Sequence, residues 1–271
     1  MCLTIRSPSD NMMQRYVREL SRRRDLLLHL VMSGLKAQHR NSVLGYFWWL
    51  LDPLVGVLLY YFVVVIVFDR QGGATYGLYL VIGMIVWRWV SSTIQGASKS
   101  VVSQAGIIQQ VYLPKAIFPI GVAMTQLFNF GFGLLIIAGF SLAFGVIPGK
   151  HLVWLPLVVA TQLSLMLAIA LPIAFYCVFV RDIESIVAHG IRVWFFASPV
   201  IWTPDRVADV LPGLLLWNPM AHLLGAYRDV LLFHRAPDFA ALGLVLVASS
   251  SVIVWMTSVY SRSEHRIVKA L

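Results

Sequence analysis

The sequence predicts an all-α membrane protein whose subunit crosses the bilayer with six helices. Of its 271 residues, 59% are hydrophobic and 12% are charged, and the mean hydropathy is +0.79. An ordinary soluble domain carries about 25% charged residues, so this chain has too little polar surface to cover itself in water. Its apolar segments are continuous rather than alternating, which favours helices over a closed barrel, the other fold that satisfies its backbone inside lipid.

Six apolar runs are long enough to cross a bilayer, which takes about 20 mainly apolar residues in a helix. The fifth run is the shortest. The runs cover residues 44–68, 76–97, 117–147, 152–180, 186–203 and 239–260. We expect residues 1–271 to form a single transmembrane domain, made of an interfacial helix (11–40), a six-helix bundle (44–260) and a cytoplasmic tail (261–271).

Lysines and arginines predict the orientation. The net charge of +9 would suggest nucleic acid in a soluble protein, but here the accumulation of positive charge in cytoplasmic segments explains it. With the N-terminus inside, inner segments hold 15 of the 21 basic residues, outer segments hold five, and Arg88 lies within a run. Both termini are therefore predicted to be cytoplasmic. The inner residues are Arg6, Arg15, Arg18, Arg22, Arg23, Arg24, Lys36, Arg40, Lys99, Lys115, Arg181, Arg192, Arg262, Arg266 and Lys269, and the outer ones are Arg70, Lys150, Arg206, Arg228 and Arg235.

The N-terminal segment 11–40 can form an amphipathic helix. Leu20, Leu27, Leu30 and Val31 fall near one face, with arginines mostly opposite. This composition suits a helix lying along the inner membrane surface. A basic segment that only anchors the topology explains it equally well, and both interpretations stay open.

Residues 204–238 are too long for a turn and too interrupted for a plain spanning helix. Pro204, Pro212, Gly213 and Pro219 divide them into short pieces. We expect re-entrant or interfacial helices on the outer side, between helices five and six. Non-helical backbone at membrane depth must be buried in protein or line a water-filled cavity.

Signals for catalysis are weak. The sequence contains no P-loop, HExxH, GxSxG or GxGxxG pattern. Its seven histidines lack a metal-ligand spacing, and Cys2 and Cys177 lie far apart, so we predict neither a metal site nor a disulfide. Asp182 and Glu184 are better explained as solvated loop carboxylates than as an acid–base pair. No catalytic residue is predicted.

Aromatic residues run through the first two predicted helices, in "GYFWWLLDPLVGVLLYYF" and "WRWV". Sugar rings stack on aromatic planes, so an aromatic-lined path would suit carbohydrate, whereas interfacial belts and packing explain the pattern equally well. Arg88 either snorkels to the inner interface or points into a pathway and meets an anionic substrate. The candidate pathway residues are Tyr46, Phe47, Trp48, Trp49, Tyr60, Trp87, Arg88 and Trp89.

A short half-polar piece, "AGIIQQVYLPKAIFPI", separates the second and third runs at residues 105–120. It allows about two helical turns before Pro114, which is marginal for a free helix and would gain from docking on a partner. We expect Ile107, Ile108 and Val111 to offer apolar contact, and Lys115 to stay at the membrane surface. A plain connecting loop is the alternative.

The order of several motifs is similar to that of one transporter family. In sequence order they are "LGYFWWLLDP", "GMIVWRW", "SKSVVSQAGIIQQVYLPKAIFPI", "VRDIESIV", "FFASPVIW" and "LWNPMAHLLGAYRDVLL", which span most of residues 44–235. Together they resemble the membrane subunit of ABC-2 type exporters, in the group that moves O-antigen, capsule or teichoic-acid polysaccharides. Arg88 departs from the apolar or small polar residue often found at its position in that group.

That resemblance implies a homodimer in the bacterial cytoplasmic (inner) membrane, with the path between the two copies. Two copies of a cytoplasmic ATP-binding subunit would carry the ATP and Mg, leaving no cofactor in this chain. The substrate would be a lipid-linked glycan, and nucleic acid would play no part. The N-terminal helix would correspond to an interfacial gate helix, Tyr46 to Trp49 would lie near the inner entrance, and 204–235 near the outer exit. The helix that couples to the ATPase would comprise Gly106, Ile107, Ile108, Gln109, Gln110, Val111, Tyr112 and Leu113.

Other functions remain open on sequence grounds. An ABC-2 permease for a drug or another lipid would share the fold and the coupling helix. A membrane-embedded lipid–sugar transferase would need clustered carboxylates or histidines at one membrane face, and the sequence offers only Asp182 and Glu184. A secondary transporter would show more helices in repeated halves and a midplane ion site.

Overall fold

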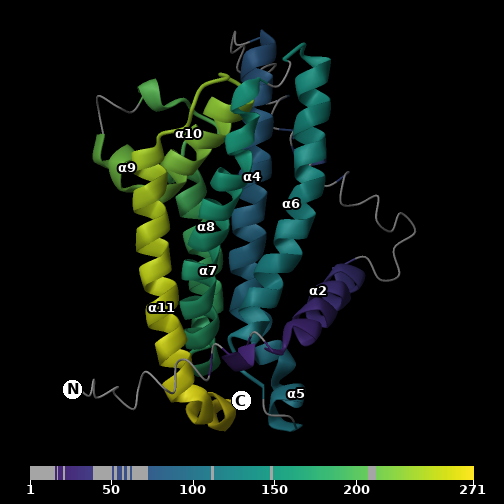
Figure 1. Ribbon diagram of the computed structural model, residues 1–271, viewed down its shortest axis with the longest axis vertical. Coiled ribbons are helices and arrows are strands. Elements are labelled where there is room, and N and C mark those ends of the chain that lie inside the picture. The colour runs from purple at the N-terminus through teal and green to yellow at the C-terminus, as the bar shows by residue number, and fades with distance from the viewer. Residues whose placement is uncertain are drawn as a thin grey trace, which may run out of the picture.

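The computed structural model describes residues 16, 18–20, 22–38, 51, 54–56, 58–59, 62, 73–110, 113–146, 149–206 and 212–271. Regular structure in these residues is helical throughout, and the long helices stand side by side in an elongated bundle (Figure 1). The α-helices are α2 (Arg24–Gln38), α4 (Gly73–Ser100), α5 (Ala105–Gln110), α6 (Ile117–Ala143), α7 (Leu155–Phe179), α8 (Asp182–Ala197), α9 (Pro212–Trp217), α10 (Pro219–Leu231) and α11 (Phe239–Ala270), with 3-10 turns at Val102–Gln104, Lys150–Trp154 and Pro204–Arg206.

Four helices of the described chain are long and apolar enough to cross a membrane. They cover Thr75–Ser100, Ile117–Ala143, Lys150–Phe179 and Phe239–Ala270, and so match the second, third, fourth and sixth predicted runs. The predicted all-helical, multi-pass membrane fold is confirmed. Most of the first run, 44–68, lies outside the described residues, so the count of six stays a prediction.

The fifth predicted run differs from the helix that forms there. Helix α8 begins at Asp182 rather than 186 and ends at Ala197 rather than 203. Asp182 and Glu184 occupy its first turn, where carboxylates interact favourably with the helix dipole. Its 16 residues rise about 24 Å, less than the roughly 30 Å hydrocarbon core. A turn at 198–202 follows.

Helix α4 is the centre of the bundle. It contacts α6, α7, α8 and α10, and 78% of its most apolar window is buried inside the chain, against 22% for α11. Two glycines let α4 and α6 approach closely, as small residues do between membrane helices. A Cβ atom at Gly96 would lie 2.7 Å from Val122, and one at Gly133 would lie 2.5 Å from Ile85.

Helix α11 lies at the periphery of the bundle, as its small buried share indicates. Large apolar side chains on it are exposed, among them Leu244, Val247 and Trp255.

The two ends of the bundle carry different short helices. Helices α2 and α5 and the last turns of α11 lie at one end, here termed the α5 end, whereas α9 and α10 lie at the opposite, α10 end (Figure 1). The 32 residues of α11 are about 48 Å long, so the helix extends well beyond a bilayer core. Residues 261–270, predicted as part of a tail, are thus a direct continuation of α11.

Helix α2 is the longest described part of the predicted N-terminal amphipathic helix. Leu27 and Leu30 pack against the core cluster at the α5 end and approach Gly121 of α6. Leu28 and Met32 on other faces are 61% and 59% exposed. The helix therefore has a packed side and an apolar exposed side, whereas its position relative to a membrane surface stays a prediction.

Asn218 connects helix α10 to the bundle through hydrogen bonds. Its Oδ1 accepts the backbone N–H of Met220 at 3.0 Å, capping α10, and also the indole N–H of Trp194 at 3.0 Å. Its Nδ2 donates to the Ala197 carbonyl at 3.1 Å and to the Ser198 hydroxyl at 3.0 Å. One side chain thus joins the start of α10 to the end of α8.

Candidate coupling site at the α5 end

Helix α5 has one buried and several exposed positions. It is six residues long, too short to be stable alone, and follows a 3-10 turn at Val102–Gln104. Ile108 is 3% exposed and packs into the core, whereas Ile107 is 48% exposed. Gly106, Gln109 and Gln110 are exposed as well. The helix is therefore held by one side chain and presents the others outward.

This arrangement divides the predicted coupling residues. Ile107 faces outward together with Gly106 and the two glutamines, while Ile108 and Leu113 belong to the chain's own core. Val111 and Tyr112 lie outside the described residues. An apolar contact with a partner could therefore be made by Ile107 and not by Ile108, a distinction that the sequence of the segment did not show.

Ile108 belongs to a buried cluster that joins most elements of the α5 end. Leu171 and Phe175 come from α7, Tyr260 and Ile267 from α11, and the cluster also contains Tyr16, Val101, Leu113, Ile117 and Phe118. The Tyr260 hydroxyl donates to the Leu171 carbonyl at 3.0 Å. The cluster that contains Ile108 thus also contains side chains from α6, α7 and α11.

A buried ion pair lies directly after α5. The Lys115 ammonium donates to Oε2 of Glu264 at 2.7 Å, and the Lys115 backbone N–H donates to Oε1 of the same carboxylate at 3.2 Å. The two side chains are only 1% and 7% exposed. Lys115 is therefore buried in the protein, where the last turns of α11 cover it and supply its counter-charge. Its position at the membrane surface stays a prediction.

Tyr16 completes this buried group. Its hydroxyl oxygen accepts the backbone N–H of Ala116 at 3.2 Å. Burial raises the pKa of Tyr16, and the negative charge of the nearby Glu264 raises it further, so the hydroxyl stays protonated. Tyr16, Lys115 and Glu264, termed the Lys115 cluster below, thus join the N-terminal segment, the loop after α5 and the end of α11.

The sequence contained a weak signal for this cluster. Residues 261–271 hold Arg262, His265, Arg266 and Lys269, and Glu264 is the one acidic residue among them. A lone acid in a basic segment raises the question of its partner. Sequence reasoning counted Lys115 only as a topology charge and did not consider Glu264.

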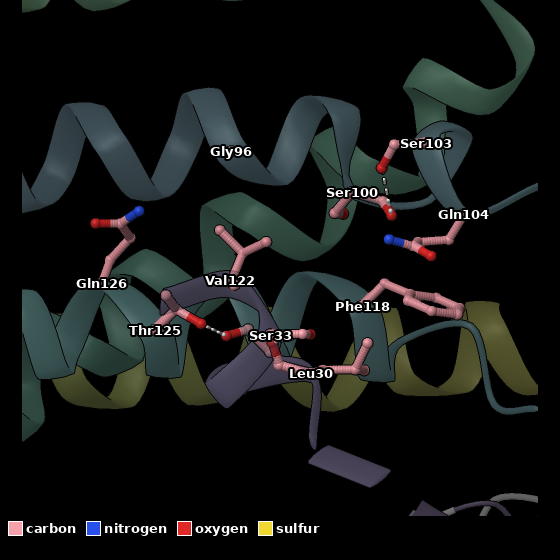
Figure 2. Close-up of a pocket in the computed structure, with 12 residues that line it drawn as sticks. Leu30, Ser33, Gly96, Ser100, Ser103, Gln104, Phe118, Val122, Thr125 and Gln126 are labelled. Carbon is pink, nitrogen blue, oxygen red and sulfur yellow. Dashed lines mark hydrogen bonds between the residues drawn. The ribbon is translucent and has the colours of Figure 1, made fainter. Parts of the chain in front are cut away.

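A cavity of about 430 Å³ lies beside the same end, between α2, α4 and α6, within the size range of small-ligand pockets. Figure 2 shows Ser100, Ser103 and Gln104 toward one end of it and Thr125 and Gln126 toward the other. Among the described residues, its lining is uncharged and includes the hydroxyl groups of Ser33, Ser100, Ser103 and Thr125. The other lining residues are Leu30, Gly34, Gly96, Phe118, Gly121 and Val122.

The three predicted pathway residues on α4 are two buried tryptophans and one exposed arginine. Trp87 is 6% exposed and packs edge-on against Trp194, with ring centroids 5.6 Å apart. Trp89 is 3% exposed and stacks on Phe130 at 4.5 Å. Arg88 between them is exposed. Tyr46, Phe47, Trp48, Trp49 and Tyr60 lie outside the described residues, so a pathway role for this set stays a prediction.

Arg228 is a second buried cation that the sequence did not reveal, because it was counted as an outer surface charge. It is 2% exposed and donates to the carbonyls of Pro199 at 2.6 Å, Val200 at 2.9 Å and Tyr79 at 3.4 Å. Its guanidinium carbon lies 3.3 Å from the Tyr79 ring centroid. Asp229 pairs instead with the exposed Arg235. Arg228 therefore joins α10 to α4 and to the turn after α8.

The acidic pair at the start of α8 lies on the surface. Glu184 pairs with Lys99 at 2.9 Å, and both side chains are about half exposed or more. Asp182 is exposed. Exposed pairs of this kind contribute little to stability, and the arrangement agrees with solvated carboxylates, although they lie in the first turn of α8 and not in a loop as predicted.

Comparison with known proteins adds a family match and several relatives. A family described as "ABC-2 type transporter" matches residues 25–232. An "O-antigen export system permease protein RfbA" of Myxococcus xanthus is 33% identical over 248 residues, covering 91% of this chain and 95% of that protein. Two Klebsiella pneumoniae proteins of the same description are 24% and 23% identical over the same shares of both chains.

Proposed function

Because this chain belongs to the ABC-2 type transporter family, we propose that it is the membrane subunit of a transporter that exports a lipid-linked polysaccharide. A relative that is 33% identical along 91% of the chain is described as an O-antigen export permease, which supports a polysaccharide over a drug or another lipid. The structural observation that carries the proposal is the exposed face of α5, held at the end of the bundle by Ile108.

The subunit works as a homodimer with two copies of a separate ATP-binding subunit, which supplies the ATP and Mg. We place the α5 end on the cytoplasmic side of the inner membrane, because positive charge accumulates there. Basic residues at or beside this end in the described chain are Arg18, Arg22, Arg23, Arg24, Lys36, Lys99, Lys115, Arg181, Arg262, Arg266 and Lys269. The α10 end is then outer, and 204–238 lies near the exit.

Helix α5 is the docking element for the ATP-binding subunit. Ile107 is a large apolar side chain left 48% exposed at the cytoplasmic end, and Gln109 and Gln110 beside it provide uncharged hydrogen-bonding groups. Inserting Ile107 into a cleft of a partner removes apolar surface from water, which is favourable. Because Ile108 anchors the other face, force applied to α5 is passed to the core beneath it.

Replacing Ile107 with aspartate is expected to prevent stable association with the ATP-binding subunit, since it places an uncompensated charge in an apolar contact. Co-purification of the two subunits from a membrane extract measures the effect. Ile107→Val, which keeps an apolar side chain, is the matched control and should co-purify normally. Ile108→Asp should instead lower the yield of folded chain. Normal association of Ile107→Asp would contradict docking through this face.

Arg88 is our candidate for contact with an anionic part of the substrate. It is exposed on a largely buried helix, as Gln95 and Lys99 are nearer its end, and lies near the middle of α4, about 18 Å before Ser100. Half the thickness of a hydrocarbon core is about 15 Å, so snorkelling would have to span most of a leaflet. A position facing a water-filled path or a second protein surface suits a mid-helix arginine better.

Replacing Arg88 with leucine should reduce export at least tenfold, because a charge that meets the substrate in a low-dielectric path contributes on the order of 1.5–3 kcal/mol per charged hydrogen bond. Export of the lipid-linked glycan in reconstituted vesicles is the measurement, at matched levels of permease. Arg88→Lys keeps the charge and should retain most of the transport. Unchanged flux in Arg88→Leu would remove Arg88 from the pathway.

The proposed function as a whole is tested by reconstituting the chain with its ATP-binding subunit and measuring ATP hydrolysis with and without lipid-linked glycan. Stimulation by the glycan is expected. A complex that forms but responds to a drug or a different lipid would favour the alternative substrate, and failure of any ATP-binding subunit to co-purify would refute the assignment.

A further inference from the structure

We propose that the Lys115–Glu264 ion pair transmits displacement of α5 to α11, so that the loop after α5 and the last turns of α11 move as one body. The inference rests on the proposed docking of an ATP-binding subunit on α5. It assigns a positioning role to Lys115 and Glu264, which the docking proposal alone does not include.

The geometry supplies two links from one carboxylate to one residue. Glu264 binds both the side chain and the backbone N–H of Lys115, at 2.7 and 3.2 Å. Lys115 follows the last residue of α5, Gln110, by five positions, and Pro114 immediately before it limits the backbone. Because Glu264 contacts both the main chain and the side chain of Lys115, it fixes where the loop lies along α11, and does not merely keep the two segments close.

Burial makes the link resistant to separation. Lys115 and Glu264 are 1% and 7% exposed at the side chain, so water cannot replace the partner that either charge would lose. Breaking such a pair leaves an uncompensated buried charge, which is strongly unfavourable. Two segments joined by an apolar contact of similar area can slide past each other with little loss of free energy, because the hydrophobic effect is non-directional. The ion pair therefore resists relative movement of the two segments.

Helix α11 is well placed to carry the movement onward. Only 22% of its most apolar window is buried in the chain, and its contacts with other elements are mainly those along α7 and, to a smaller extent, α10, so a displacement of α11 is chiefly a movement against these two helices. At its other end, Asp238 caps α11 by accepting the backbone N–H groups of Ala240 and Ala241, and residues 232–238 connect it to α10. A shift at Glu264 thus has a continuous helical route from the α5 end to the α10 end.

Movement of α5 can also reach α6, by a covalent route that is separate from the ion pair to α11. Helix α6 begins at Ile117, two residues after Lys115, so movement of α5 also reaches α6 along the chain. Tyr16 holds the same loop through Ala116. The Lys115 cluster consequently joins three segments that are distant in sequence, and removal of the ion pair takes away the charged link to α11, leaving apolar contacts with α11 and the covalent route to α6 in place.

The test uses the double variant Lys115→Met with Glu264→Gln. Both charges disappear together, so neither is left buried alone, and the glutamine carbonyl can still accept the Lys115 backbone N–H. The matched control is Lys99→Met with Glu184→Gln. It removes a lysine–glutamate pair of similar length, 2.9 Å, that is exposed rather than buried.

In the permease alone, the readout is amide hydrogen exchange after loosening α5 with Ile108→Ala. We expect this substitution to increase exchange at 261–270 in the wild-type background and in the Lys99–Glu184 control. In the Lys115–Glu264 double variant the increase should stay confined to 105–118. An equal increase at 261–270 in the double variant would overturn the proposal, and this result does not depend on any partner subunit.

In the reconstituted complex, the double variant should bind the ATP-binding subunit normally and export at least about fivefold less glycan per ATP hydrolysed, the lower range of a typical coupling between sites. An unchanged ratio would also overturn the proposal. If the double variant accumulates poorly, Glu264→Asp keeps the charge but shortens the side chain, and it should lower the same ratio. Lack of association in the wild type would instead refute the proposed function, leaving the exchange experiment to decide the role of the ion pair.

Discussion

Replacing Arg228 with methionine is expected to detach α10 from the bundle and to lower the stability of the folded chain by about 3 kcal/mol or more. The guanidinium donates to three carbonyl oxygens, those of Pro199, Val200 and Tyr79. Methionine is similar in length but donates to none of them. The Tyr79 carbonyl keeps its donor within α4, whereas those of Pro199 and Val200 lose theirs. Each buried acceptor left without a partner costs roughly 1–3 kcal/mol, so the two losses together place this substitution among the most severe single changes.

The effect is measurable as loss of monodisperse protein on heating in detergent. Arg235→Met is the matched control: Arg235 also pairs with a neighbour, Asp229, but its side chain is 68% exposed, so its replacement should have little effect. Gly83→Ala probes the same joint from the other side, because its Cβ would lie 2.7 Å from both the Arg228 Nη2 and the Val200 carbonyl oxygen. Arg228→Met protein as heat-stable as Arg235→Met would show that the carbonyl contacts do not hold α10.

Replacing Glu264 with glutamine alone should destabilise the α5 end by about 3–5 kcal/mol, the cost of breaking a buried ion pair by removing one partner. The Lys115 ammonium would stay 1% exposed beside a neutral side chain. Lys115→Met alone should cost a similar amount, because it leaves the carboxylate buried with its remaining donors. Thermal stability of the purified chain is the measurement.

The double variant Lys115→Met with Glu264→Gln should be more stable than either single variant, because no charge is left without a partner. This non-additivity is the signature of a direct interaction, as double-mutant cycles detect it. Strictly additive losses would show that the two residues contribute separately, and would weaken the case for transmission through their contact.

Much of the fold could be predicted because spanning helices are a property of local composition. The runs 76–97, 117–147, 152–180 and 239–260 correspond to α4, α6, α7 and α11 within a few residues at most ends. The hydrocarbon core demands a minimum apolar length, and backbone polar groups must be satisfied inside each segment. The short α5 was also predictable, since Pro114 stops the helix after a segment too short to span.

Helix ends were less predictable where other parts of the chain decide them. Helix α8 ends at Ala197 although apolar residues continue to 203. The turn after it is stabilised by Asn218, which accepts from Trp194 and donates to Ala197 and Ser198, and by Arg228. Pro199 is a local signal for this end, because the residue before a proline disfavours the helical conformation and Ser198 is extended. The side chains that hold the turn after it come from a later part of the chain, so 186–203 alone could not show them.

The sequence by itself determined a helical membrane protein, four of its spanning segments, the short helix between two of them and the motifs of its family. Only the tertiary structure decided which charges are buried and which side of α5 is free. The prediction of orientation counts Lys115 and Arg228 among basic residues that face water or lipid headgroups. In the structure each is buried beneath a helix that is distant in sequence. Likewise Ile107 and Ile108 are the same residue type at adjacent positions, and only the tertiary structure shows that Ile108 joins the buried cluster while Ile107 stays exposed. Burial depends on which helices meet, and that is a property of the assembled bundle rather than of any segment.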